Sequence, residues 1–155
     1  MMAIPNIKTN DEVLILTADG FDETGAVHCL VRMREAGLPV SIVGISSGNV
    51  TSSHGISVRA DRSLDQVMAE VNSPHLVVIP GGRRSALALQ LDPRVSRLLQ
   101  KVVARGGYLA MMWNAEEVLL GERHAALNES DHLLSQGEKS VELFTQQLIE
   151  LTVRA

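Results

Sequence analysis

Cysteine and aromatic residues are scarce in this chain of 155 residues, which has one Cys, one Trp, one Tyr and two Phe. A single cysteine excludes an internal disulfide and is typical of a reducing compartment, so we expect a cytoplasmic protein. The first ten residues include no long apolar run, so we expect no signal peptide there. Because no apolar stretch is long enough to cross a bilayer, we expect no membrane partner.

Positive charge is also limited: the chain has 14 Lys and Arg against 18 Asp and Glu, so its formal net charge is −4. Phosphate contacts need clustered basic residues, so nucleic acid is not an expected partner. The histidines and the cysteine show no metal-ligand spacing, and we expect neither a metal nor another cofactor. Length and composition indicate one globular domain at 12–155 behind a polar N-terminal tail at 1–11.

Apolar runs alternate with amphipathic segments along this domain. Continuous apolar runs are typical of parallel strands buried on both faces, and we expect such strands at 12–17, 40–45, 75–79 and 108–112. Shorter strands are expected at 56–60 and 133–135. Helices are expected at 22–36, 61–71, 85–91, 92–105, 115–120 and 140–153. The alternation predicts an α/β fold with a mainly parallel central sheet and helices on both faces.

Residues 106–120 (GGYLAMMWNAEEVLL) run from a strand into a helix with almost no loop. Many α/β hydrolases hold their nucleophile at such a corner, exposed above the sheet. Here the corner residue is Trp113, which has no nucleophilic atom and no proton that a base could usefully remove. Ligands in α/β folds bind at the carboxyl ends of the strands. The sequence therefore offers the frame of an active site with a bulky apolar group at its centre.

Three segments, LILTADGFDE, HLVVIPGG and GGYLAMMWNAEEVLL, resemble the ThiJ/PfpI superfamily, which is related to class I glutamine amidotransferases. The resemblance implies a flavodoxin-like three-layer α/β sandwich, and it implies a homodimer because the superfamily commonly forms one. Its enzymes pair a cysteine at the strand-to-helix corner with a glutamate from the first βα loop. A histidine often follows some two dozen residues later.

This chain departs from that pattern at each position. The nucleophile position is Trp113, and the acid position, five residues after Gly20, is Gly25. Only about twenty residues separate Leu120 from the last helix, which is too few for the usual histidine loop. The chain therefore resembles a divergent, C-terminally shortened member without the catalytic cysteine. We expect Trp113 to fill the vacant site as a plug, although a ligand-stacking platform is the alternative.

Other residues with chemical potential have structural explanations that we favour. Cys29 lies in a predicted helix beside His28, and adjacent helical side chains point about 100° apart, so we expect a core residue. Asp22 and Glu23 could act as an acid/base pair, but helix capping and the helix dipole explain them. Within the same helix, Val27 and Val31 share one face.

Three functions follow from these observations. The first is a non-catalytic binding or interaction module. The second is a family-type enzyme, a peptidase/amidase or a glyoxalase/deglycase acting on small carbonyl or peptide substrates, which would need an unrecognised nucleophile. The third is a sensor of small anions or metabolites, in which Gly81, Gly82 and Asn114 form an anion-binding nest beside Arg83 and Arg84.

Overall fold

The computed structural model describes residues 12–119 and 131–154. Its centre is a sheet of six strands in the order β5-β2-β1-β6-β7-β8, and every neighbouring pair is parallel. The strands are β1 (Val13–Thr17), β2 (Val40–Gly44), β5 (Arg62–Ser63), β6 (Leu76–Ile79), β7 (Tyr108–Met111) and β8 (Leu133–Ser135). The mainly parallel sheet predicted from the apolar runs is confirmed.

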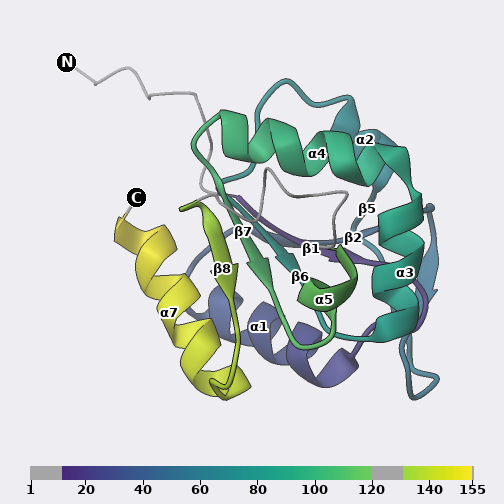
Figure 1. Ribbon diagram of the computed structural model, residues 1–155, viewed down its shortest axis with the longest axis horizontal. Helices are drawn as coiled ribbons and strands as arrows, with labels where there is room; N and C mark the ends of the chain where they lie inside the picture. Colours follow the sequence, from purple (N-terminus) through teal and green to yellow (C-terminus); the bar gives the residue numbers. More distant parts are fainter. Residues whose placement is uncertain (1–11, 120–130, 155) are drawn as a thin grey trace.

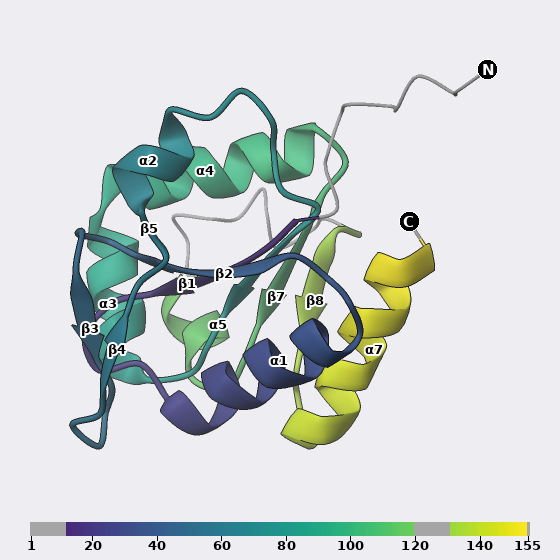
Figure 2. The same ribbon diagram turned by 180° about the vertical axis from the view of Figure 1, so that it is seen from behind.

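Helices cover both faces of this sheet and produce three layers (Figure 1). The helices are α1 (Glu23–Glu35), α2 (Leu64–Met68), α3 (Arg83–Leu91), α4 (Pro93–Ala104), α5 (Ala115–Leu119) and α7 (Val141–Arg154). Figure 2 shows α1 and α7 together on one face and α2, α3, α4 and α5 on the other. The flavodoxin-like α/β sandwich is therefore confirmed.

Side chains of β1 show how the sheet divides the core. Leu14 and Leu16 belong to the cluster beneath α2 to α5, whereas Val13 and Ile15 belong to the cluster beneath α1 and α7. Successive strand residues point to opposite faces, so an uninterrupted apolar run fills both clusters. This explains why the buried strands show no polar alternation.

Side chains cap the starts of three helices, and the capping expected of Asp22 is confirmed. The Asp22 carboxylate accepts the Thr24 N–H at 3.1 Å and begins α1. Ser63 begins α2 with a capping box, and Asp92 begins α4 with Pro93 in the first turn. These side chains satisfy N–H groups that a helix start leaves unpaired, which makes them readable from local sequence.

Two local features were not predicted. The face that Val27 and Val31 share is exposed, at 41% and 47%, because α1 packs on the sheet through the smaller side chains of Ala26 and Cys29 together with Met33. A strand missing from the sequence reading, β3 (Asn49–Thr51), pairs antiparallel with β4 (Ser57–Arg59). β3 is only three residues long and has one apolar residue, Val50, so its own sequence gives no strand pattern. It is a strand because β4 pairs with it.

Candidate functional site

The carboxyl ends of β1, β6 and β7 meet as predicted, and the turn after β6 is wedged between the other two. The Asp22 N–H donates to the Gly81 carbonyl at 2.9 Å. A Cβ at Gly81 would overlap the Trp113 carbonyl oxygen, and one at Gly82 would overlap the Gly20 carbonyl oxygen. Only glycine allows backbones to approach this closely. Gly81 and Gly82 therefore bring the ends of β1 and β7 together.

The sharpest point of the strand-to-helix corner lies one residue later than expected. Asn114, with φ of 70°, is the non-glycine residue in the left-handed region within the described part of the chain. Asparagine tolerates this region better than a bulky residue such as Trp113. The corner residue in the backbone sense is thus Asn114, which corrects the assignment to Trp113.

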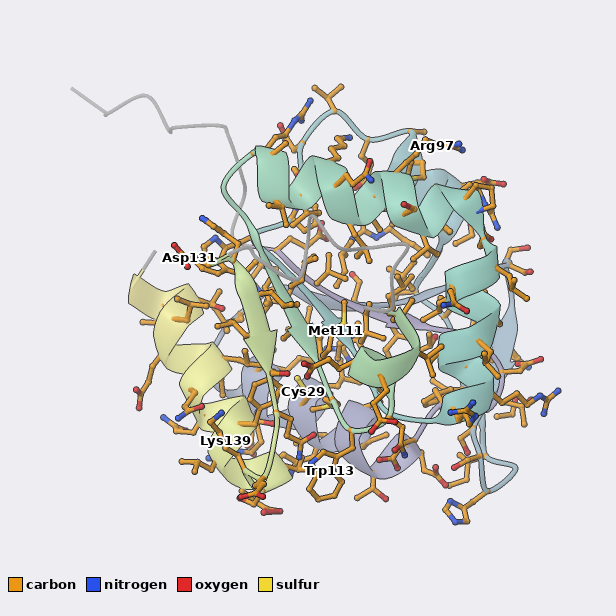
Figure 3. The ribbon with its side chains drawn as sticks, viewed as in Figure 1. Cys29, Arg97, Met111, Trp113, Asp131 and Lys139 are labelled. Atoms are coloured by element: carbon orange, nitrogen blue, oxygen red, sulfur yellow. The ribbon has the colours of Figure 1, made fainter. Side chains whose placement is uncertain are left out.

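Trp113 is not a buried plug, and that expectation was wrong. Its side chain lies at the molecular surface and is 50% exposed (Figure 3). The indole N–H donates to the Gly137 carbonyl at 2.7 Å, and the backbone N–H donates to Gln136 Oε1 at 3.2 Å. These two bonds draw the indole toward the segment that follows β8 and away from the core.

The neighbouring Met112 occupies the interior beside the family acid position. Met112 is 3% exposed and belongs to the cluster beneath α1 and α7. A Cβ at Gly25 would lie 3.1 Å from Met112 Sδ. A glutamate at Gly25 would therefore have to displace a thioether that already fills the space.

Gln136 is a site residue that the sequence reading missed. It is 1% exposed, and its Nε2 donates to the Lys139 carbonyl at 2.9 Å while its Oε1 accepts the Trp113 N–H. Its own backbone N–H donates to the Met111 carbonyl. A buried amide with both ends bonded holds two segments in place. The sequence signal was only its position directly after a predicted short strand.

A cavity of about 480 Å³ opens beside this corner, between the end of β7, α5 and the end of β8. Its lining residues are Met111, Met112, Trp113, Asn114, Glu116, Glu117, Leu133 and Gly137. The structure therefore joins Trp113 and Asn114, which the sequence singled out, with two carboxylates that it did not.

The arginines of the expected anion nest lie apart from this cavity. Arg83 and Arg84 are in the first turn of α3, directly after Gly82. The aliphatic stem of Arg84 lies against Gly20. Arg84 lines a second cleft of about 330 Å³, together with Asp19 and residues that follow β2. Arg84 thus lies in a different cleft from Trp113, and Arg83 is not among the described lining residues of either.

Cys29 is a core residue, as predicted. Its thiol is fully buried in α1 and donates to Met33 Sδ at 3.7 Å. Burial raises the pKa of the Cys29 thiol to about 12. Because the thiolate is the nucleophilic form, this thiol is chemically inert at neutral pH.

Glu23 has partners that helix capping alone did not predict. Glu23 lies in the first turn of α1, and its carboxylate accepts the Ser53 hydroxyl at 3.0 Å and approaches His54 Nδ1 at 2.6 Å. Burial raises the pKa of Glu23, but hydrogen bonds from its own backbone N–H, Ser53 and His54 outweigh it, so the pKa is lowered.

These three residues do not form a catalytic triad. In a triad the histidine contacts the nucleophile with one ring nitrogen and the carboxylate with the other. Here Nδ1 of His54 faces both Ser53 and Glu23, and the serine hydroxyl donates directly to the carboxylate. The cluster instead fastens the loop between β3 and β4 to the start of α1.

Two properties of the described residues bear on partners. No helix in the described ranges is long and apolar enough to span a membrane. Among residues 12–119 and 131–154, no group of three or more His, Cys, Asp or Glu is arranged to hold a metal ion.

Comparison with known proteins decides the family. The model of the DJ-1/PfpI family matches residues 11–132. The chain belongs to the DJ-1/PfpI family. It is 28% identical over 109 residues to Deglycase TK1284 of Thermococcus kodakarensis, covering 70% of this chain and 64% of that protein. It is 30% identical over 107 residues to Protein dj-1beta of Drosophila melanogaster, covering 68% and 56%. The match therefore spans less than two thirds of either relative.

Solved structures agree on the fold. A mutant of the DJ-1 superfamily protein STM1931 from Salmonella typhimurium superposes with a TM-score of 0.80 at 21% identity, covering 92% of this chain and 90% of that one. Oxidized DJ-1 of Toxoplasma gondii superposes with a TM-score of 0.81 at 23% identity, covering 90% and 89%. Residues 121–130, half of the segment predicted to be shortened, lie outside the described residues, and the shortening stays a prediction.

Proposed function

We propose that this chain is a non-catalytic member of the DJ-1/PfpI family that acts as a binding module at the β7–α5 corner. One observation carries the proposal: the only cysteine of the chain, Cys29, is buried in the core away from the corner, and the motif resemblance matches Trp113 to the family nucleophile. Without a thiolate at the corner, no covalent attack on a carbonyl can begin there.

The acid position supports the same conclusion. A general acid or base must reach the reacting group within hydrogen-bond distance. Gly25 has no side chain, and Met112 fills the space into which a carboxylate would extend. Glu23, two residues earlier, directs its carboxylate to Ser53 and His54 instead. Both halves of the family's catalytic pair are thus replaced by groups that cannot transfer protons or form bonds to substrate.

The test is turnover of methylglyoxal, a small carbonyl compound, by the purified protein. We expect consumption at the rate of buffer, and the same rate for the Cys29→Ser variant. Trp113→Cys should also stay inactive, because the neighbouring carboxylate is still absent at Gly25. Turnover by the wild-type chain that disappears in Cys29→Ser would overturn the proposal.

A second candidate is a deglycase-type enzyme. It is favoured by the curated relatives, since Deglycase TK1284 and Deglycase PH1704 of Pyrococcus horikoshii are both 28% identical to this chain. This enzyme would need a nucleophile other than a cysteine at the corner. Saturable methylglyoxal consumption that survives Cys29→Ser would support it against the binding module.

We further propose that the chain forms a homodimer, because Val27 and Val31 expose apolar surface on α1. Apolar side chains grouped on one helix face are typical of surfaces that associate. Light scattering should then give twice the chain mass of 16.8 kDa, and Val27→Lys/Val31→Glu should return it to one chain mass. A wild-type monomer at micromolar concentration would contradict this proposal.

A further inference from the structure

The cavity at the β7–α5 corner has a lining that selects for one kind of ligand. Its volume of about 480 Å³ lies in the range of small-molecule sites. The inference rests on the part of the proposed function that makes this corner a binding site. The described lining combines apolar side chains, an aromatic ring and carboxylates.

The indole of Trp113 is held in place before any ligand arrives. Its Nε1–H donates to the Gly137 carbonyl, and the backbone N–H of the same residue donates to the buried Gln136 amide. The ring has therefore already used its only hydrogen-bond donor. What remains for a ligand is the π surface of a half-exposed ring, which attracts cations.

Both charged groups among the described lining residues are negative. Glu116 and Glu117 line the cavity from the first turn of α5, and no Lys, Arg or His is among its described lining residues. Neither carboxylate forms an ion pair with a residue in the described ranges. Their place in the first turn stabilises α5. They nevertheless make the cavity unfavourable for an anion and favourable for a cation.

The apolar part of the lining distinguishes between kinds of cation. Leu133 is partly exposed and contributes aliphatic surface beside the Trp113 ring, whereas Met111 and Met112 also line the cavity but are almost fully buried. A strongly hydrated metal ion gains little from such surface, whereas an alkylated ammonium group can bury its carbon atoms against it. The cavity and the hydrogen-bonded indole would favour an organic cation even without the two carboxylates.

We propose that this cavity binds a small organic cation, with the charged nitrogen over Trp113 and the Glu116 and Glu117 carboxylates balancing its charge. Binding a quaternary or alkylated ammonium needs an aromatic face, nearby negative charge and partial exclusion of water. The indole and the two carboxylates supply the first two at this corner, and the cavity would enclose part of the ligand. No bond is made or broken, so the step requires no co-reactant.

Choline serves as the probe, and 3,3-dimethyl-1-butanol is its neutral isostere. Trp113 is the only tryptophan of the chain, so its fluorescence reports on this cavity directly. We expect a saturable fluorescence change with choline at a dissociation constant on the order of millimolar. The neutral isostere should bind at least about tenfold more weakly, and added salt should weaken choline binding. Inorganic phosphate should produce no change.

Variants test the two parts of the site separately. Glu116→Gln/Glu117→Gln should weaken choline binding about tenfold or more, while Glu142→Gln, an acidic first-turn residue of α7, serves as the matched control and should leave it unchanged. Trp113→Leu, followed by calorimetry, should also weaken it. Circular dichroism checks that each variant keeps the wild-type fold.

Three results would overturn the proposal. They are equal binding of the neutral isostere, a fluorescence response to phosphate in place of choline, and no saturable response to choline at about 50 mM, well above the expected constant. None of these bears on the absence of catalysis, which methylglyoxal turnover measures. Conversely, turnover with intact choline binding would remove the proposed non-catalytic role and leave the cation site in place.

Discussion

Replacing Gly81 with alanine tests whether the close approach of β6 and β7 builds the corner. The added Cβ would overlap the Trp113 carbonyl oxygen, which is backbone and cannot rotate away. The segment around it is held by the Met112 N–H bond to Ile79 and by the Trp113 N–H bond to Gln136. Relief of the overlap therefore requires the turn or the corner to shift.

Gly106 provides a matched control because its constraint is of a different kind. It has a φ of 89°, and a Cβ there would meet nothing within 4 Å. Gly106→Ala therefore introduces backbone strain without overlap, which costs about 1–2 kcal/mol. Gly81→Ala introduces overlap without that strain. In both variants alanine also lowers the conformational entropy of the unfolded chain, which stabilises the folded protein by about 0.4–1 kcal/mol. This gain is the same in both and cancels in the comparison.

We expect Gly106→Ala to lower the free energy of unfolding by about 1 kcal/mol. Overpacking costs about 1–3 kcal/mol and occasionally more, and overlap with a braced backbone should lie at the upper end, at about 3 kcal/mol. With the same gain subtracted from both, the two variants differ by about 1.5 kcal/mol, which corresponds to a Tm roughly 3–6 °C lower for Gly81→Ala. Urea unfolding followed by circular dichroism gives both free energies.

The fluorescence of Trp113 adds a local measurement. Because the overlapping atom belongs to that residue, Gly81→Ala should shift its emission in the folded protein, whereas Gly106→Ala should not. A Gly81→Ala protein as stable as Gly106→Ala, with unchanged emission, would refute the reasoning. It would mean that the turn after β6 and the corner do not brace each other.

Two further predictions concern buried or paired side chains. Cys29 should react with iodoacetamide at pH 8 far more slowly than an exposed thiol, because burial raises its pKa to about 12. Mass spectrometry should detect the label only when urea unfolds the chain. Rapid labelling of the folded protein would contradict its place in the core. The ionised Glu23 carboxylate stabilises the folded state, and Glu23→Gln should remove this stabilisation. It is fully present above pH 4.5, the ordinary pKa of a glutamate, and it is lost as the pH falls through the lowered pKa of the folded state. The two proteins should therefore unfold at different urea concentrations at pH 7 and at converging ones in acid, whereas a constant difference would contradict the lowered pKa.

The elements that depend on neighbouring residues could be predicted from the sequence. Apolar runs located the buried strands, since a parallel strand covered on both faces needs no polar alternation. Asp22, Ser63 and Asp92 marked helix starts because a cap bonds to an N–H two or three residues away. The corner at 106–120 was readable for the same reason.

The direction of each side chain at the corner could not be read in this way. Met112 and Trp113 are adjacent and both apolar, and they lie between the end of β7 at Met111 and the start of α5 at Ala115, where neither the strand period nor the helix period applies. Size favoured the larger residue as the plug, yet Met112 is the one in the interior. The left-handed Asn114 and the acceptors at Gln136 and Gly137 turn the indole outward.

The sequence by itself thus determined the fold class, the buried strands and the absence of a thiol at the corner, because these depend on local pattern and on residue identity. Only the tertiary structure decided that Trp113 lines an open cavity with Glu116 and Glu117, and that Glu23 meets His54 across 31 residues. Such contacts join distant segments through the folded chain. Their geometry is set by packing, which no short stretch of sequence contains.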